Sequence, residues 1–391
     1  MNDEWQRRSP HSAANQFVAT HSPLATHHSS FIIHHSSLII HHSSFILHPL
    51  LTPIFVIGYP GDVGGANTEC WHTLRLWRRF GQSVRLIPTS QPDQRWRNRL
   101  DQIGCSTISA AMDELKSVPG LAGATVVSFC NASFLRHADR FRDLGCRVVW
   151  VNCMTWLFPD ERKHYQSRGP FDCYVFQSRY QRSALLGQLA KYGVRPDQCH
   201  LIRGAFAWEE FPFRPLGHAV GAPLVVGRIS RPAVDKYAVN TWAIYRRIPH
   251  PIRARVMAWD RGVERKLGQP PPWAECLPAG SETPQEFFGK LHCMIQASGG
   301  AEENWPRSGL EAMAGGVAIV AQNHWGWREM IRHGQTGFLA DCNDQVAYYA
   351  ARLAYDEELR MDIIHRARKV LEEDLANPEA LWAGWRELLN Q

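Results

Sequence analysis

The sequence lacks the features that mark several large classes of protein. No Cys-x-x-Cys pair occurs among its ten cysteines, and their positions show no zinc-type spacing. No apolar run approaches the roughly 18 residues that a membrane-spanning helix needs. These absences argue against a structural zinc site and against a transmembrane protein. The cysteines are expected to be reduced, buried thiols in a cytosolic protein.

Composition and charge are those of an ordinary globular chain. The 391 residues are 45% hydrophobic and 20% charged, and this length allows two domains with sizeable cores. The net charge is +6, but the basic residues are scattered rather than clustered. Nucleic acid is therefore not an expected partner, whereas a basic groove fits a small anionic ligand. Peripheral contact with the inner face of a membrane is compatible with a cytoplasmic location.

Residues 1–52 form a low-complexity tail rich in histidine and serine. His27 to Leu47 repeats HHSSFII, HHSSLII and HHSSFIL. A metal-binding tract is one interpretation, but no acids or cysteines accompany the histidines. The tail also lacks the basic region, continuous apolar region and cleavage site of a signal peptide. We expect it to be disordered and to have no part in the activity.

The first folded half, residues 53–215, alternates short apolar runs with helical segments. Ile54 to Ile57 predicts a first buried strand, and Cys70 to Phe80 predicts the helix after it. Further strands are expected at Val84 to Ile87, Thr125 to Phe129, Arg147 to Val151, Tyr174 to Gln177 and His200 to Ile202. This alternation is typical of a parallel sheet with helices on both faces, whose ligands lie beyond the carboxyl ends of the strands.

Two loops after these strands carry candidate binding residues. In the first, Gly64 and Gly65 allow a close backbone approach to a ligand, and Asn67 follows them. The loop is not Gly-x-Gly-x-x-Gly, so dinucleotide binding is not supported. The second loop, after Val151, contains Thr155 and Trp156, and Trp156 could either stack on a sugar ring or simply pack.

A proline- and glycine-rich linker, Pro212 to Pro223, separates this half from a second αβ domain at residues 222–374. Leu224 to Arg228 predicts its first strand, and Arg231 and Lys236 lie in the following loop. Residues 375–391 are expected to form a terminal helix.

The segment Ala301 to Leu339 is the most informative part of the chain. Glu303 and Glu311 lie eight positions apart around the start of an expected helix, and Pro306 suits its first turn. Amides at the helix start, near Arg307 and Ser308, can bind a phosphate. The two carboxylates would accept hydrogen bonds from hydroxyls. Together these groups suit a nucleotide sugar.

This segment resembles the donor-binding signature of retaining glycosyltransferases of family four. Their pattern is Glu-x7-Glu, Ala-Met-Ala-x-Gly, an apolar strand, a Gly-Gly-x-x-Glu-like loop and Gly-x-x-Gly-x-Leu. The matching segments here are Glu303/Glu311, Ala312 to Gly316, Val317 to Val320, Trp325 to Glu329 and Gly334 to Leu339. The resemblance implies the GT-B architecture of two facing Rossmann-like domains, an N-terminal acceptor domain and a C-terminal donor domain, with the terminal helix crossing back to the first domain.

The resemblance also implies roles for the candidate residues. Arg228, Lys236 and Glu303 would be catalytic. Donor binding would involve these three together with Gly64, Gly65, Arg231, Arg307, Ser308 and Glu311. The acceptor side would include Asn67, Thr155 and Trp156.

Two departures from the family pattern stand out. Many relatives place a histidine in the loop after Val151, whereas the nearest histidine here is His164. Relatives usually have a glycine where Pro306 stands, so one amide donor is absent.

The expected function is transfer of a sugar from a nucleoside-diphosphate sugar to a glycan, lipid-linked or small-molecule acceptor. No Asp-x-Asp motif is present to hold a metal on the diphosphate, so we expect no metal and no cofactor, with basic residues neutralising the charge. Retention of configuration follows from the resemblance alone. A non-catalytic protein that binds nucleotide sugars and a sugar-nucleotide epimerase are the alternatives.

Overall fold

The computed structural model describes residues 52–61, 64–91 and 93–391. All of them belong to one compact unit, His48–Gln391. Apart from Thr52, the tail at residues 1–52 lies outside the described residues.

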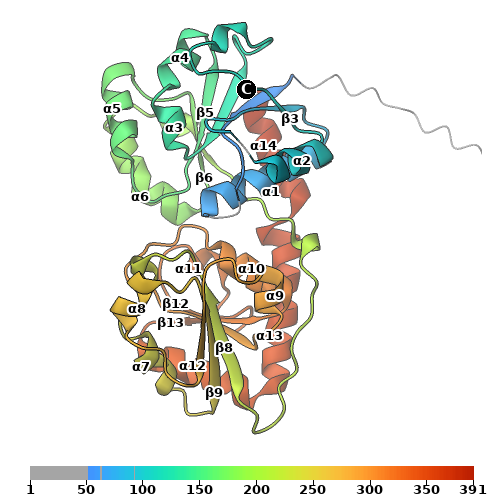
Figure 1. Cartoon of the computed structure of the whole chain (residues 1–391), viewed down its shortest axis with the longest axis vertical. Helices are drawn as coiled ribbons and strands as arrows, with labels where there is room; N and C mark the ends of the chain where they lie inside the picture. Colours follow the sequence, from blue (N-terminus) through green and yellow to red (C-terminus); the bar gives the residue numbers. More distant parts are fainter. Residues whose placement is uncertain (1–51, 62–63, 92) are drawn as a thin grey trace, which may run out of the picture. The chain divides into compact units, whose positions relative to one another are not determined.

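The N-terminal domain contains a parallel sheet of seven strands in the order β3-β2-β1-β4-β5-β6-β7 (Figure 1). Its strands are β1 (Ile54–Ile57), β2 (Val84–Ile87), β3 (Ser106–Thr107), β4 (Thr125–Phe129), β5 (Arg147–Val151), β6 (Cys173–Phe176) and β7 (Cys199–Leu201). Strands β1 and β6 are buried along their whole length. Continuous apolar runs of this kind are typical of a parallel sheet covered on both faces.

Helices cover this sheet. They are α1 (Gly65–Arg79), α2 (Gln94–Gln102), α3 (Ala132–Leu135), α4 (Ala138–Asp143), α5 (Pro159–Arg168) and α6 (Arg179–Ala190), with short 3₁₀ turns at Leu115–Ser117, Pro196–Gln198 and Trp208–Glu210. Side chains cap several of them: Asp93 accepts a bond from Trp96 N–H, and Ser178 accepts one from Gln181 N–H. Helix α1 begins inside the glycine-rich loop, five residues before the predicted start at Cys70.

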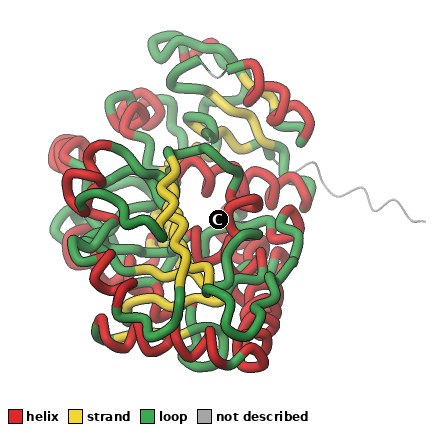
Figure 2. Tube along the Cα trace, turned by 60° about the horizontal axis from the view of Figure 1, so that its bottom comes forward, coloured by secondary structure: helices red, strands yellow, loops and turns green. Residues whose placement is uncertain are grey.

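The C-terminal domain contains a parallel sheet of six strands in the order β10-β9-β8-β11-β12-β13. Its strands are β8 (Leu224–Ile229), β9 (Ile252–Met257), β10 (Ala274–Leu277), β11 (Cys293–Gln296), β12 (Ala318–Gln322) and β13 (Phe338–Ala340). Its helices are α7 (Thr241–Arg246), α8 (Arg261–Leu267), α9 (Pro284–Phe288), α10 (Arg307–Gly315), α11 (Trp327–Met330), α12 (Asn343–Tyr355) and α13 (Glu357–Val370), with a 3₁₀ turn at Val234–Lys236 and a π-helical turn at Leu371–Leu375. Figure 2 shows helices and loops around the strands.

The last helix, α14 (Pro378–Leu389), packs in the core of the N-terminal domain. Trp385 meets Trp77 of α1 edge to face, with ring centroids 4.8 Å apart, and Trp382 stacks on Phe80 at 5.5 Å. The predicted crossover helix is therefore confirmed, and both tryptophans serve to pack it against the N-terminal domain. None of the helices in the described part of the chain is long and apolar enough to cross a bilayer.

Candidate functional site

Three non-glycine residues in the described part of the chain adopt a positive φ, and all three follow a strand. They are Cys130 after β4 (φ 48°), Ala258 after β9 (φ 77°) and Trp325 after β12 (φ 51°). Such conformations cost of order 1–3 kcal/mol each and cluster at functional sites. In both domains the strain lies at the carboxyl ends of the strands, where parallel sheets bind ligands.

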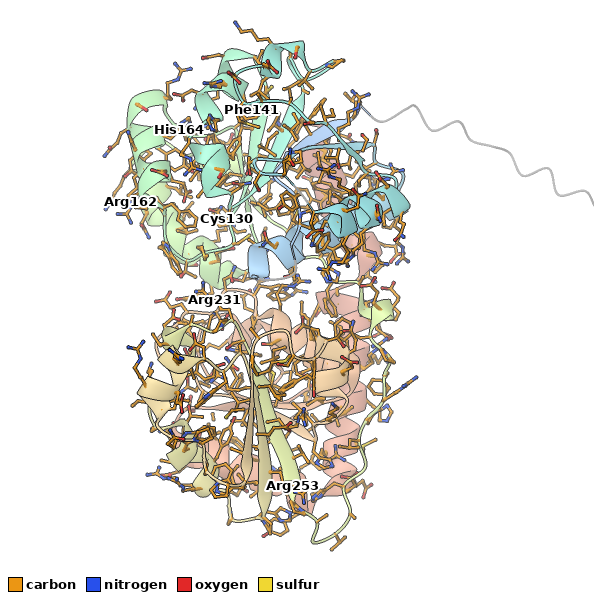
Figure 3. All side chains as sticks on the ribbon, in the orientation of Figure 1. Cys130, Phe141, Arg162, His164, Arg231 and Arg253 are labelled. Atoms are coloured by element: carbon orange, nitrogen blue, oxygen red, sulfur yellow. The ribbon has the colours of Figure 1, made fainter. Side chains whose placement is uncertain are left out.

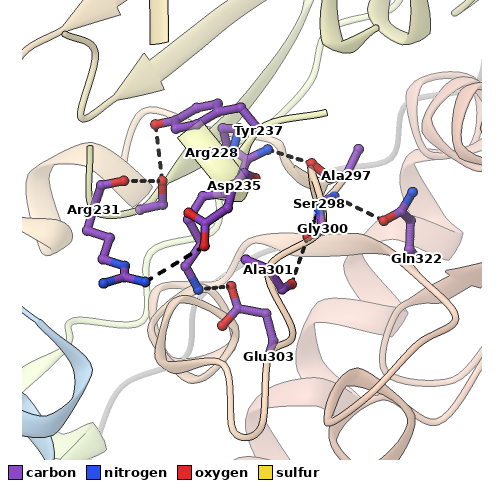
Figure 4. Close-up of polar contacts among 12 residues, drawn as sticks. Arg228, Arg231, Asp235, Tyr237, Ala297, Ser298, Gly300, Ala301, Glu303 and Gln322 are labelled. Carbon is purple, nitrogen blue, oxygen red and sulfur yellow. Dashed lines mark hydrogen bonds and ion pairs between the residues drawn. The ribbon is translucent and has the colours of Figure 1, made fainter. Parts of the chain in front are cut away.

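The side chain of Arg228, at the end of β8, is fully buried. Its guanidinium donates to Ala297 O at 2.7 Å and to Lys236 O at 2.6 Å (Figure 4). The prediction placed this charge against a diphosphate. In this structure the guanidinium is buried and joins the loops that follow β8 and β11.

The ring of Tyr237 packs against the Arg228 guanidinium. It lies 4.3 Å from the Arg228 guanidinium carbon, and the residue is fully buried. Its hydroxyl donates to Met257 O and accepts from Ser230 Oγ, both at 3.1 Å. Arg228 and Tyr237 therefore connect the loops after β8, β9 and β11.

Lys236 and Glu303 form an ion pair at the surface of this loop cluster. Lys236 Nζ lies 2.7 Å from Glu303 Oε1, and the side chains are 14% and 17% exposed. The adjacent backbones are also joined, since Ala301 N–H donates to Asp235 O at 3.0 Å. Two residues that the sequence placed 67 positions apart are thus brought into direct contact. Arg231 is more exposed, and its ion pair with Asp235 is long, at 4.0 Å.

Two glycines allow these loops to approach so closely. A Cβ on Gly299 would stand 2.0 Å from Tyr237 O, and a Cβ on Gly326 would stand 1.9 Å from Asn304 O. Gly326 N–H also donates to Glu303 O at 2.8 Å, which fixes the backbone that carries the acid. Sequence analysis missed the role of Gly299, and it missed Lys266, whose Nζ donates to Val234 O beside the same loop.

Helix α10 begins next to Glu303 without a side-chain cap, and Pro306 occupies the cap position. The first-turn amides of such a helix point outward and carry its positive dipole end. Ser308 lies in this first turn. Glu311 lies one turn further on and is half-buried. Burial raises the pKa of Glu311 to about 7, and the nearby charge of Arg307 opposes the shift.

The side chain of Arg307 turns away from this helix start. Its Nη1 donates to Glu69 Oε2 at 2.7 Å and to Ala205 O at 2.8 Å, both in the N-terminal half of the chain. Burial raises the pKa of Glu69, and Arg307 opposes this shift. In this structure the Arg307 side chain therefore joins two segments of the chain, while the residue's backbone lies at the helix start.

The loops beside Glu303 also bind the loop after β6. The carboxylate of Glu329 accepts from Arg179 N–H at 2.9 Å and from Tyr180 N–H at 2.7 Å, at the start of α6. Asn304 Nδ2 donates to Gln177 Oε1 at 2.9 Å. We call these bonds the Glu329 clasp. Sequence analysis placed Glu329 at the end of the Gly-Gly-x-x-Glu-like loop but did not identify its partners.

The N-terminal domain contains a cavity of about 350 Å³ at the carboxyl ends of its central strands. It is lined by Val56, Ile57, Gly58, Tyr59, Pro60, Gly61, Ala66, Asn67, Cys70, Thr89, Ser90, Phe129, Cys130, Asn131 and Ser133. We call it the N-terminal cavity. Its volume is at the lower end of the range for small-molecule sites.

Of the predicted acceptor-side residues, Asn67 lines the N-terminal cavity, whereas Thr155 and Trp156 do not. Thr155 is buried, and Trp156 is 44% exposed. Gly64 has a φ of 100°, which favours glycine, and Gly65 opens α1. Among the described residues, no group of three or more His, Cys, Asp and Glu side chains is placed to hold a metal ion.

Comparison with protein families identifies the C-terminal part of the chain. Residues 277–370 match the family model of glycosyl transferases group 1. The match includes Glu303, Glu311 and Glu329 and covers less than half of the chain. No curated protein matches by sequence.

Solved structures are similar over most of the chain. HepE of Anabaena in complex with UDP-glucose has a TM-score of 0.67 at 15% identity, covering 87% of this chain and 100% of that one. A TarM mutant of S. aureus, solved with UDP, has a TM-score of 0.69 at 10% identity, covering 87% and 100%. Sucrose-phosphate synthase of Thermosynechococcus elongatus has a TM-score of 0.64 at 15% identity, covering 87% and 98%. These likenesses confirm the expected fold, two parallel-sheet domains of the GT-B type.

Proposed function

We propose that this protein is a glycosyltransferase that moves a sugar from a nucleoside-diphosphate sugar to a hydroxyl acceptor. The observation that carries the proposal is the ion pair between Lys236 and Glu303 beside the uncapped start of α10. It places a cation, amide donors and a hydroxyl-accepting acid at one site. The family match over residues 277–370 and the nucleotide-bound structural neighbours support it.

Lys236 and the first-turn amides of α10 stabilise the leaving diphosphate. Transfer breaks the anomeric C–O bond, so negative charge builds on the phosphate oxygen while the sugar acquires oxocarbenium character. Donors aimed at that oxygen before the reaction lower the barrier most effectively. Arg231, at the exposed side of the same loop, adds positive charge.

The two acids bind hydroxyls. Glu303 accepts from the transferred sugar and orients its ring, and Lys236 exchanges its bond to Glu303 for one to the phosphate. Glu311 accepts from the ribose hydroxyls. A hydrogen bond to a charged group contributes about 1.5–3 kcal/mol, so each acid adds substantially to donor affinity.

Arg228 acts as a positioning residue in this mechanism. It holds the carbonyl of Lys236 and so fixes the backbone from which the lysine side chain extends. Its own charge is satisfied by two carbonyls and a tyrosine ring, which keeps the loops ordered before the donor binds.

Retention of configuration and independence from metal are part of the proposal. The charge on the diphosphate is met by Lys236, Arg231 and amides, so activity should survive EDTA. Front-side departure and attack fits a site in which no carboxylate is assigned as nucleophile. NMR of the product's anomeric proton tests retention, and inversion would refute it.

A thermal-shift panel of UDP-, GDP- and ADP-sugars tests donor binding. A ligand at about 100 times its dissociation constant adds roughly 2.7 kcal/mol to the free energy of unfolding. UDP-glucose comes first, because HepE was solved with it. Donor binding without release of nucleoside diphosphate in the presence of any acceptor would favour the non-catalytic alternative. Pro306 is consistent with that alternative, because it removes an amide donor. Conversion of donor alone would favour an epimerase.

A further inference from the structure

Cys130 and Cys153 follow two neighbouring strands of the N-terminal sheet. Strands β4 and β5 are parallel, with Phe129 paired to Val151, so the two cysteines lie just beyond the paired ends. Neighbouring strands are separated by about 4.8 Å. Cys130 is one residue and Cys153 two residues beyond the paired ends, so an offset of about 3.3 Å along the strand adds to this spacing. The combined separation, about 6 Å, is compatible with the roughly 4.4–6.8 Å between the Cα atoms of disulfide-bonded cysteines.

The two residues are already in contact. Cys153 N–H donates to Cys130 Sγ at 3.2 Å. The contact with the Cys130 thiol, together with burial, raises the pKa of Cys153 well above its usual value. Cys153 therefore remains a protonated thiol, and its amide hydrogen points at the Cys130 sulfur.

Small molecules can reach Cys130 through the N-terminal cavity, which it lines. The residue is half-buried and is labelled in Figure 3. Cys153 does not line this cavity. The pair thus has one thiol that a small oxidant can reach and a second thiol behind it.

We propose that Cys130 and Cys153 are a reversible redox pair that forms a disulfide when a small peroxide enters the N-terminal cavity. The Cys130 sulfur attacks one oxygen of the peroxide, the O–O bond breaks, and Cys130 becomes a sulfenic acid. With hydrogen peroxide the leaving hydroxide takes the Cys130 thiol proton and departs as water. The Cys153 sulfur then attacks the Cys130 sulfur. The S–O bond breaks, the S–S bond forms, and the proton of Cys153 leaves with the hydroxide as water. Two thiols are oxidised, and one hydrogen peroxide is reduced to two waters.

The disulfide changes the cavity directly. It links the loop after β4 to the loop after β5 and fixes the side chain of Cys130, which lines the wall. The inference does not depend on the proposed function, because the chemistry requires only the two thiols, the cavity and an oxidant.

The experiment is peptide mapping by mass spectrometry after treatment of the full chain with hydrogen peroxide. The expected product is a peptide that joins Cys130 to Cys153, with two hydrogen atoms lost, and dithiothreitol should reverse it. The Cys153→Ser and Cys153→Ala variants should instead accumulate sulfenic acid at Cys130, detected with dimedone. The matched control is Cys342→Ser, which removes an exposed cysteine and should cross-link like the wild type.

Three results would overturn the inference. One is oxidation of Cys342 under conditions in which the Cys130–Cys153 peptide does not form. Another is a link from Cys130 to Cys70, which lines the same cavity. The third is dimedone labelling of Cys130 that is equal in the wild type and in both Cys153 variants. Circular dichroism of each variant verifies that the sheet is intact.

Discussion

The loops at the carboxyl ends of the two sheets are organised in opposite ways. In the C-terminal domain they are joined by charged and aromatic side chains, with Arg228 and Tyr237 below and the Lys236–Glu303 pair at the surface. In the N-terminal domain the corresponding loops surround a cavity of about 350 Å³, and the described residues that line it are uncharged. A preformed polar site suits a ligand that carries a fixed negative charge, such as a diphosphate. An uncharged cavity suits a ligand recognised by shape and hydroxyls.

The largest effect should come from Lys236→Ala. If Lys236 stabilises the leaving diphosphate, kcat falls about 100- to 1000-fold, the loss expected for a charge stabiliser at a reacting centre. Steady-state kinetics with the identified donor measure it. Lys290→Ala is the control, because Lys290 forms an ion pair with Glu282, away from this site. Equal kcat values for Lys236→Ala and the wild type would remove Lys236 from the mechanism.

Arg228→Ala should destabilise the protein and thereby show that the C-terminal loops are preorganised. The change removes two charged hydrogen bonds and leaves two carbonyls unpaired, so the free energy of unfolding should fall by about 3 kcal/mol. Urea denaturation measures it. The control is Arg231→Ala, an exposed arginine in the same loop, which should change stability by less than about 0.5 kcal/mol. Equal effects of the two substitutions would contradict the positioning role.

Glu311→Gln should remove a pH dependence from donor binding. Burial raises the pKa of Glu311 to about 7. Hydroxyls bind the carboxylate best, so donor affinity should increase as the pH rises through this value. Glu311→Gln should weaken binding about 10- to 100-fold at pH 8 and abolish this increase. Calorimetric titrations at several pH values measure it, and a wild-type affinity that is flat with pH would refute the assignment.

The same shift has the opposite effect on stability. Because the fold disfavours ionised Glu311, its stability contribution is complete below the ordinary pKa of 4.5 and is lost as pH rises through about 7. Glu161 in the N-terminal domain behaves alike, since burial raises its pKa to about 7. Donor affinity is therefore compared between Glu311→Gln, in the C-terminal domain, and Glu161→Gln, in the N-terminal domain. Only the former substitution should change donor binding.

The smallest effect should come from Glu329→Gln, which weakens the Glu329 clasp. Loss of the charge on the acceptor at the start of α6 should cost about 1 kcal/mol. Hydrogen exchange should therefore become faster at the amides of Arg179 and Tyr180, as measured by mass spectrometry of the peptide that contains them. The control is Glu114→Gln, an exposed acid of the N-terminal domain that lies outside the clasp. Unchanged hydrogen exchange at both amides would show that the Glu329 clasp does not stabilise the start of α6.

The sequence predicted the fold and the positions of the acids because both depend on local patterns. Short apolar runs predicted most of the strands, and the spacing of Glu303 and Glu311 around Pro306 predicted α10. The two-residue strand β3 was missed, because Ser106 and Thr107 carry no apolar signal.

The partners of the arginines could not be predicted. Arg228 binds the carbonyl of Ala297, 69 positions away, and Arg307 binds Glu69, 238 positions away. Backbone carbonyls have no sequence signature, and Glu69 looks like any polar residue of an amphipathic helix. A basic residue after a strand therefore indicates a charged site. It does not indicate whether that residue's side chain or the side chain of a neighbouring residue reaches the ligand.

The most direct test of the central claim is calorimetric titration of UDP-glucose, or of the sugar nucleotide that performs best in the panel, into the wild type and three variants. The account predicts one binding site per chain, weakened in both Lys236→Ala and Glu311→Gln and unaffected in Lys290→Ala. Binding that is equally strong in all four proteins, or absent from the wild type for every sugar nucleotide, would contradict it.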